Sequence, residues 1–176
     1  MKNIKKNNTK LTLIVAVMSL ILILGTIAVI NPTKYTSFIY RNGMIIFAVG
    51  IISTIVSTYF LYQFGSKLFD RNAIFSINSK GISDKINMLD YPNISWKDII
   101  KIEEYNINNV PHLKVFVDNP QQYINQKKGF KKWVLNFNYK KYHTPILLNS
   151  TYLSCSFNDF KKSILDSYKE YHNSDD

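Results

Sequence analysis

Two long stretches without a charged residue constrain this chain more than any other feature of its sequence. Residues 11–30 read LTLIVAVMSLILILGTIAVI, and residues 43–64 read GMIIFAVGIISTIVSTYFLYQF. An α-helix rises about 1.5 Å per residue, so about twenty residues cross the ~30 Å hydrocarbon core of a bilayer. A helix also keeps its backbone hydrogen bonds internal, as lipid requires. The sequence therefore predicts a two-helix transmembrane hairpin over residues 11–66.

A cleaved signal peptide is the alternative for the first stretch, because Lys2, Lys5, Lys6 and Lys10 precede it. The apolar region of a signal peptide has about 7–15 residues, and a small-residue cleavage motif follows it. This stretch is longer, and TIAVINP (26–32) contains no Ala-x-Ala motif. We therefore expect an uncleaved helix.

Basic residues surround the predicted hairpin unevenly. Four lysines precede it, only Lys34 and Arg41 lie in the loop, and Lys67 and Arg71 follow it. Because lysine-rich flanks stay in the cytoplasm, both termini are expected there, joined through a short external loop. Residues 1–10 are interpreted as a basic cytoplasmic tail.

The distribution of charge disfavours nucleic acid as a partner. The chain has a formal net charge of +10. Residues 1–71 hold eight basic residues against one acidic residue, whereas residues 72–176 hold fourteen lysines against eleven acidic residues. Most of the surplus thus lies near the bilayer, where anionic headgroups attract it. The lone Cys155 excludes an intrachain disulfide and fits a cytoplasmic domain.

Residues 72–172 have the length and pattern of one soluble domain, followed by a frayed tail at 173–176. Alternating apolar residues predict strands, and DYPN (90–93) is expected to interrupt the pattern. Asn119 and Pro120 predict the start of a short helix over 120–127. The strands are expected at residues 73–78, 82–88, 99–107, 112–118, 133–139 and 144–149.

The period changes to that of a helix after residue 156. Apolar side chains at Phe157, Phe160, Ile164, Leu165 and Tyr168 share one face. A terminal helix covering a small curved sheet or barrel would bury both apolar surfaces. The expected fold class is α+β: a transmembrane helical hairpin, then a small β-barrel or sheet with a C-terminal helix.

Short motifs in the soluble part resemble those of a known family. Gly81, Ile82 and Asp84 are followed by a Trp-x-Asp-Ile step at Trp96, Asp98 and Ile99, and then by Asp118, Pro120, Tyr123 and Ile124. In this order they resemble a family of small bacterial inner-membrane proteins with two N-terminal transmembrane helices and a pleckstrin-homology-like (PH-like) cytoplasmic domain. The resemblance covers about residues 11–170. The resemblance implies two transmembrane helices followed by a PH-like cytoplasmic domain. It implies no catalytic residue.

Trp96 and Asp98 are interpreted as structural residues of this motif. A buried tryptophan would anchor the sheet through its large apolar area. An aspartate in such a turn commonly caps backbone N–H groups. A ligand site at these two residues is the alternative.

A lysine-rich stretch, QKKGFKKWVLNFNYKKYH (126–143), suggests a surface for an anionic partner. The predicted strand, at ~3.3 Å per residue, separates its two lysine groups by ~23 Å. Trp133, Leu135 and Phe137 alternate and are expected to face the core. Either this is a solvated rim, or the first group contacts membrane headgroups. That first lysine group consists of Lys127, Lys128, Lys131 and Lys132, and the second of Lys140 and Lys141.

No pattern of catalytic or cofactor-binding residues is present in the sequence. His112, His143 and His172 are far apart and lack the spacing of a metal site. No glycine-rich phosphate loop or Gly-x-Ser-x-Gly elbow occurs. Glu103 and Glu104 are adjacent on a predicted strand, so they would point to opposite faces. We expect a non-enzyme without cofactor or metal.

Three functional hypotheses follow from these features. The first is a membrane-anchored PH-like interaction module that binds a protein partner or the membrane surface. The second is an immunity or stress-protection protein against a toxin or bacteriocin. The third is an accessory subunit of a transport complex. The sequence indicates neither the partner nor the oligomeric state.

The uneven distribution of lysines around the two apolar stretches predicts the membrane topology. Reporter fusions at the C-terminus should report the cytoplasm, and fusions after Thr36 should report the exterior, because basic flanks stay inside. An external C-terminus would contradict the predicted topology.

Overall fold

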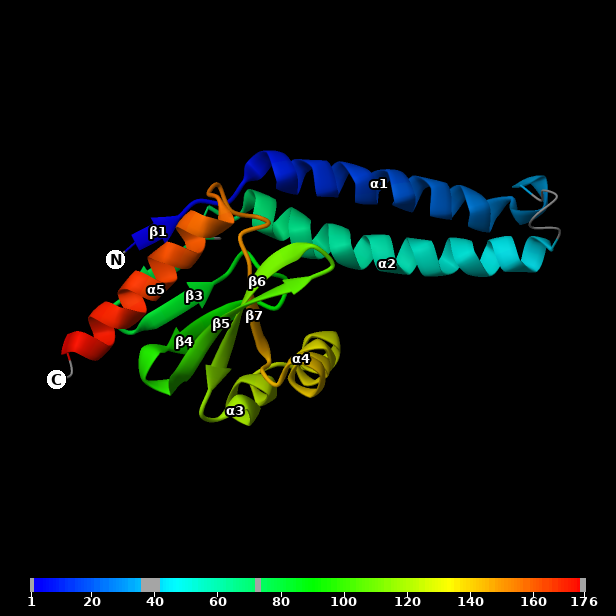
Figure 1. The fold of residues 1–176 in the computed structure, drawn as a ribbon. Coiled ribbons are helices and arrows are strands. Elements are labelled where there is room, and N and C mark those ends of the chain that lie inside the picture. The colour runs from blue at the N-terminus through cyan, green and yellow to red at the C-terminus, as the bar shows by residue number, and fades with distance from the viewer. Residues whose placement is uncertain (1, 36–41, 72–73, 175–176) are drawn as a thin grey trace. The chain divides into compact units, whose positions relative to one another are not determined.

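The chain forms two compact units, Asn8–Asn72, and Met1–Asn7 together with Ala73–Asp176. The computed structural model describes residues 2–35, 42–71 and 74–174. Figure 1 shows the order of elements: a short N-terminal strand, two long helices, antiparallel strands with two further helices before the last of them, and a C-terminal helix. The fold class is therefore α+β, as the sequence predicted.

The first unit contains two helices that are long and apolar enough to cross a membrane. They are α1 (Asn8–Ile30) and α2 (Gly43–Phe69), and the 3₁₀ turn η1 (Pro32–Tyr35) follows α1. Asn42 caps α2, because its side chain accepts a hydrogen bond from Met44 N at 2.9 Å. The loop position Thr36 lies outside the described residues.

Small residues let α1 and α2 approach closely. A Cβ added at Gly25 would lie 3.2 Å from Gly50 O, and one added at Gly50 would lie 3.0 Å from Gly25 O. Contacts this short are tighter than ordinary van der Waals contact, so a larger side chain at either glycine would displace its neighbours. Gly25 and Gly50 therefore lie where the two helices approach each other.

The second unit begins with a four-stranded antiparallel sheet in the order β1-β2-β3-β4. Its strands are β1 (Lys2–Ile4), β2 (Phe75–Asn78), β3 (Gly81–Asp84) and β4 (Tyr91–Ser95). Gly81 closes the β2–β3 turn at φ +155°, where an added Cβ would lie 2.1 Å from Ile94 O. A side chain there would collide with β4.

The N-terminal residues correct the prediction of a free basic tail at 1–10. Asn3 pairs with Ser76, and Ile4 pairs with Phe75, so β1 adds an edge strand to β2. Ser154 N donates to Lys5 O at 2.9 Å, which ties the next residues to the domain as well. An uncovered β2 edge would leave backbone hydrogen-bonding groups unpaired, and β1 satisfies them. Three residues are too few to show a strand period in the sequence.

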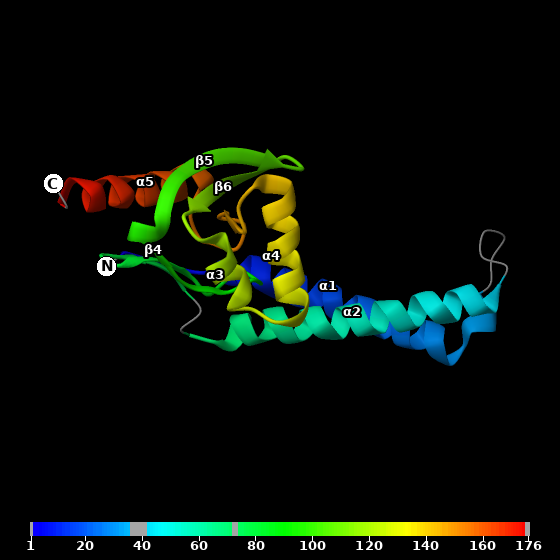
Figure 2. The same ribbon diagram turned by 90° about the horizontal axis from the view of Figure 1, so that it is seen from below.

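The second sheet is three-stranded and antiparallel, in the order β5-β6-β7. It contains β5 (Ile99–Ile107), β6 (Val110–Val117) and β7 (Ile146–Leu148), and Figure 2 shows the long, curved β5–β6 pair. Asn108 and Asn109 join β5 to β6 with φ angles of +48° and +63°. Two positive φ values form the tight turn that matches strand twist, and asparagine tolerates them. The strand predicted at 99–107 is confirmed.

Strand β4 differs from the sequence prediction, which placed a break at residues 90–93. Pro92 lies inside β4 although it has no N–H to donate to a neighbouring strand. β4 is last in the sheet order, and an edge strand accommodates a proline on its unpaired side.

Helix α4 (Gly129–Tyr142) replaces the strand predicted at residues 133–139. Leu135, Asn138 and Tyr142 are its buried residues, and their i, i+3, i+7 spacing marks one helical face. Trp133 and Phe137, expected in the core, are exposed. His143 ends the helix in the left-handed conformation (φ +62°), and its N–H donates to Tyr139 O.

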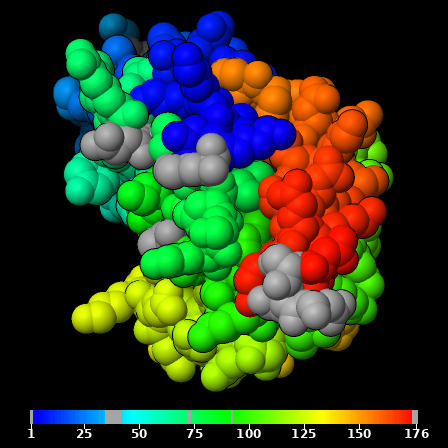
Figure 3. Space-filling model, turned by 90° about the vertical axis from the view of Figure 1, so that its left-hand side faces the viewer, coloured from blue at the N-terminus to red at the C-terminus, as the bar shows by residue number. Residues whose placement is uncertain are grey.

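The C-terminal helix α5 (Phe157–Ser174) packs its apolar face on the sheets, with Phe160 and Ile164 fully buried. Ser156 Oγ accepts from Asp159 N at 3.2 Å and caps the start of the helix. Lys2 Nζ donates to Ser163 Oγ at 2.6 Å. Figure 3 shows the blue N-terminal residues beside the orange and red residues of α5.

The two tryptophans offer a matched test of the core. Trp96 is 1% exposed and its Nε1 donates to Asn78 O at 2.8 Å, whereas Trp133 is 62% exposed. Trp96→Ala should lower the free energy of unfolding by about 3–5 kcal/mol. Trp133→Ala should lower it by less than about 1 kcal/mol, since it removes no buried contact. Denaturant unfolding of the full chain in micelles measures both, and equal losses would contradict this core.

Candidate functional site

The exposed face of α4 carries a ladder of aromatic rings. Phe130, Trp133 and Phe137 are 47%, 62% and 48% exposed. The Phe130 and Trp133 ring centroids lie 5.6 Å apart and those of Trp133 and Phe137 lie 6.0 Å apart, both pairs stacked. Their i, i+3, i+7 spacing puts them on one side of the helix, opposite buried Leu135. We call these three residues, with Lys140 and Lys141, the α4 surface.

The connection between β6 and β7 carries the α4 surface. These strands are neighbours in the sheet, yet residues 118–145 join them through α3 (Pro120–Asn125) and α4. Asn119 caps α3, because its Oδ1 accepts from Gln122 N at 3.2 Å, which confirms the predicted helix. Figure 2 shows α3 and α4 next to each other. A short turn would join antiparallel neighbours, so this longer segment adds a feature that the sheet does not need.

The predicted lysines lie differently along a helix than along a strand. Lys127 Nζ donates to Asp90 O and so serves the domain's own structure. Lys128 is exposed at the N-cap of α4, and Lys131 and Lys132 are half-buried in its first turn. The first lysine group therefore does not form one exposed cluster.

The second lysine group, which the predicted strand would have separated from the first, lies next to the aromatic ladder on α4. Lys140 follows Trp133 by seven residues and Phe137 by three, so it shares their side of the helix. Lys141 Nζ lies 5.6 Å from the Phe137 ring centroid, a cation–π distance. Both lysines are exposed. The helix thus unites aromatic rings and cations that a strand would have separated.

Trp96 and Asp98 lie in a structural network at the junction of the two sheets. Tyr123 Oη donates to Asp98 Oδ2 at 2.9 Å, and Asp118 N donates to Asp98 O at 2.9 Å. Burial, together with the hydrogen bond to Asp98, raises the pKa of the Tyr123 hydroxyl. Trp96 and Asp98, named by the family resemblance, lie in the 3₁₀ turn η2 (Trp96–Asp98). Through Asp98, this turn is hydrogen-bonded to Tyr123 of α3 and to Asp118 at the end of β6.

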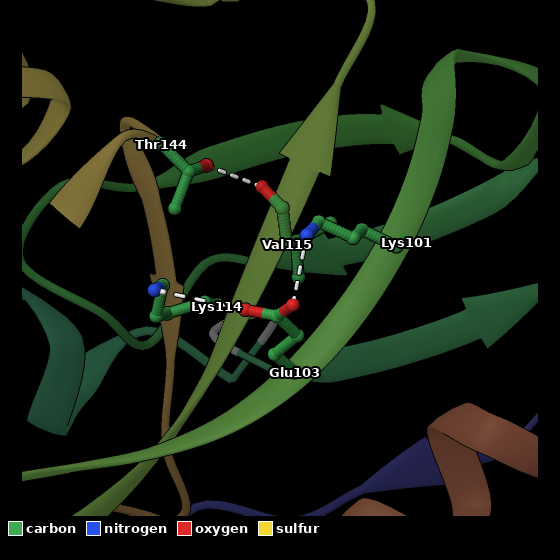
Figure 4. A network of polar contacts seen from close by, with 5 residues as sticks. All are labelled: Lys101, Glu103, Lys114, Val115 and Thr144. Atoms are coloured by element: carbon green, nitrogen blue, oxygen red, sulfur yellow. Dashed lines mark hydrogen bonds and ion pairs between the residues drawn. The ribbon is translucent and has the colours of Figure 1, made fainter.

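Glu103 and Glu104 do not form a pair of cooperating carboxylates. Glu103 lies between Lys101 Nζ at 2.8 Å and Lys114 Nζ at 3.7 Å, as Figure 4 shows. Its hydrogen bond with Lys101 lowers the pKa of this exposed carboxyl. Glu104 instead pairs with Lys161 on α5. Thr144 Oγ1 donates to Val115 O in the same view and links β6 to the chain before β7.

An open polar cavity of about 570 Å³ lies between β2 and α5. Lys2, Asp166 and Glu170 contribute charges of both signs to its lining. Lys2 Nζ donates to Ser163 Oγ at 2.6 Å, and Ser163 Oγ in turn donates to Asp159 O at 2.7 Å.

Among the described residues, no group of three or more His, Cys, Asp or Glu side chains could hold a metal ion. The expectations of no metal, no cofactor and no catalysis stay predictions. No protein family matches the chain, and no curated protein or solved structure matches it significantly.

Sequence reasoning named the first lysine group, not Lys140 and Lys141, as the candidate contact, and it missed the aromatic face of α4. The sequence contained the information, because the spacing of Phe130, Trp133 and Phe137 is that of a helix. The alternation of Trp133, Leu135 and Phe137 fits a strand equally well. The seven-residue spacing of Leu135 and Tyr142 also matches a helix, and including it in the comparison of the two periods would have favoured the helix.

The contact between Tyr123 and Asp98 makes a coupling prediction. Hydrogen bonds to charged groups contribute about 1.5–3 kcal/mol, so Tyr123→Phe should destabilise the domain by about that amount. A double-mutant cycle with Asp98→Asn should give a coupling energy of at least ~0.5 kcal/mol. The matched cycle of Tyr123→Phe with Glu103→Gln should give none. Equal coupling in the two cycles would contradict the network.

Proposed function

We propose that this chain is a membrane-anchored, PH-like interaction module and that the α4 surface is its binding surface. The hairpin holds the domain at the cytoplasmic face of a bacterial inner membrane, and the domain recruits or contacts a partner there without catalysing a reaction. The exposed aromatic ladder on an inserted helix is the observation that carries the proposal.

The connections between the hairpin and the domain support anchoring. Residues 5–7 join β1 to α1, and residues 70–74 join α2 to β2. An extended residue spans at most about 3.6 Å, so neither connection reaches beyond ~20 Å. Since β1 and β2 pair, the two outer ends of the hairpin must lie on the same side of any membrane it crosses.

The strand arrangement supports a PH-like fold. The family resemblance implies a small β-barrel or sheet with a C-terminal helix. This domain has two antiparallel sheets, of four and three strands, and a C-terminal helix that packs on them, which supports that expectation. It departs from the simple arrangement at two connections. The hairpin separates the first two strands, and α3 with α4 separates the last two.

The α3–α4 connection supports a binding role for α4. Functional residues concentrate on segments that a rigid scaffold holds but does not require. Three neighbouring exposed aromatic side chains, rather than single scattered ones, mark a contact surface.

Site-specific photo-crosslinking tests the proposal. A photoreactive phenylalanine analogue at Trp133 should form adducts with lipid or protein in native membranes, because a binding surface is covered there. The same analogue at Ile100 is the matched control, since both residues are 62% exposed and Ile100 lies on β5. Equal adduct yields at the two positions would contradict a role for the α4 surface.

A further inference from the structure

The α4 surface is aromatic along most of its length and positive at its C-terminal end. Residues 119–158 contain six lysines and no Asp or Glu, whereas the rest of residues 72–176 contains eight lysines and eleven acidic residues. The soluble domain is therefore electrically polarised, with its cations concentrated in the segment that carries the aromatic ladder. A partner that covers this surface must accept aromatic rings and supply negative charge.

The side chains of the α4 surface match the interfacial zone of a bilayer. Tryptophan and other aromatic residues prefer the headgroup level, where a ring can be apolar on one side and wet on the other. Helices that lie in this zone combine such rings with lysines around them. Trp133 and Phe137, with Lys140 and Lys141 beside them, fit that description.

The stacking of the rings disfavours nucleic acid as the occupant. Single-stranded nucleic acid binds when its bases stack on the free faces of aromatic side chains. Here Trp133 is stacked on Phe130 on one side and on Phe137 on the other. Trp133 therefore has a ring neighbour on each side along the helix, which leaves less of its faces open to a stacking base than an isolated ring would have.

A second copy of the same surface is also disfavoured. Two α4 surfaces packed face to face would place the lysines of both copies in one interface, and segment 119–158 contains no acidic residue to pair with them. An anionic bilayer supplies the missing negative charge.

The short connections to the hairpin make even weak surface binding effective. A tethered group acts at an effective concentration set by the length of its linker, and short linkers give the highest values. Residues 5–7 and 70–74 are the linkers here. A helix with few contacts could therefore remain on the membrane that holds the hairpin.

We propose that α4 binds the surface of an anionic phospholipid bilayer. Phe130, Trp133 and Phe137 insert at the headgroup level, and Lys140 and Lys141 pair with lipid phosphates. This inference rests on the proposed function, because it requires the hairpin to hold the domain at a membrane.

The chain's own tryptophans report the contact. It has two, Trp96 and Trp133, and neither lies in α1 or α2. The full chain is placed in nanodiscs of phosphatidylglycerol, with or without brominated acyl chains that quench nearby indoles. Brominated lipid should quench Trp133 but not Trp96, which is 1% exposed in the core. The Trp133→Phe variant should lose the quenchable emission.

Two comparisons test the charge requirement. Nanodiscs of phosphatidylcholine, or ~1 M salt, which shortens the Debye length to ~3 Å, should reduce the quenching of Trp133. The variant with Lys140→Gln and Lys141→Gln should reduce it too. The matched variant with Lys97→Gln and Lys169→Gln removes two exposed lysines elsewhere and should leave it unchanged. Equal losses from the two variants would overturn a defined site.

Three other results would overturn the inference. Trp133 that is unquenched by brominated lipid but open to aqueous iodide would be facing solvent. Trp133 that is shielded from both quenchers would be covered by protein, which leaves the proposed function standing with a different partner. Quenching of Trp133 by a single-stranded oligonucleotide instead of lipid would assign the surface to nucleic acid. Failure of the chain to enter nanodiscs at all would instead contradict the proposed anchoring.

Discussion

The pairing of β1 with β2 is the contact on which the rest of this structure depends. β1 precedes the apolar hairpin in the chain and β2 follows it, so their hydrogen bonds close the domain around the hairpin's two ends. Without β1, the β2 edge would lack its partner strand and Ile4 would leave its place against the core. The domain is therefore not a separable unit that begins after the second helix. Any cytoplasmic or external assignment of one hairpin end applies to the other end as well.

The sequence predicted those elements whose period extends over many residues. The two apolar stretches, β5 and the C-terminal helix each repeat their pattern long enough to exclude alternatives. β1 was missed because three residues carry no period, and β4 was missed because Pro92 argues against a strand unless the strand is known to be an edge. Both errors concern which segments become neighbours in space. That information arises from the closure of the sheet and not from local preference.

Helix α4 shows why the candidate site could be predicted only in part. The residues WVLNFNY alternate like a strand and also fit a helix, and the choice was decided by Leu135 and Tyr142, which are buried on one helical face. Because this segment is a helix and not a strand, a different set of its side chains is buried. Trp133 and Phe137 moved from the core to the surface, and Lys140 and Lys141 joined them on one face. Composition indicated a basic aromatic segment, but only the helix shows which side chains act together. Trp96 is buried in the core, and the Asp98 carboxylate accepts a hydrogen bond from Tyr123, which belongs to a distant segment of the chain.

Disulfide crosslinking across the first strand pair tests the central claim most directly. In a full chain with Cys155→Ser, cysteines replacing Asn3 and Ser76 should form an intramolecular disulfide on mild oxidation of membranes. These residues are register partners, and directly opposed residues have Cα atoms about 4.5–5.5 Å apart, within the range of a disulfide. Cysteines replacing Asn3 and Ser83 are the matched control, because Ser83 lies one strand further away, at about 9–10 Å. The account predicts a disulfide in the first pair and none in the second. A first pair that stays reduced, or a second pair that oxidises equally well, would contradict the insertion of the hairpin within the domain.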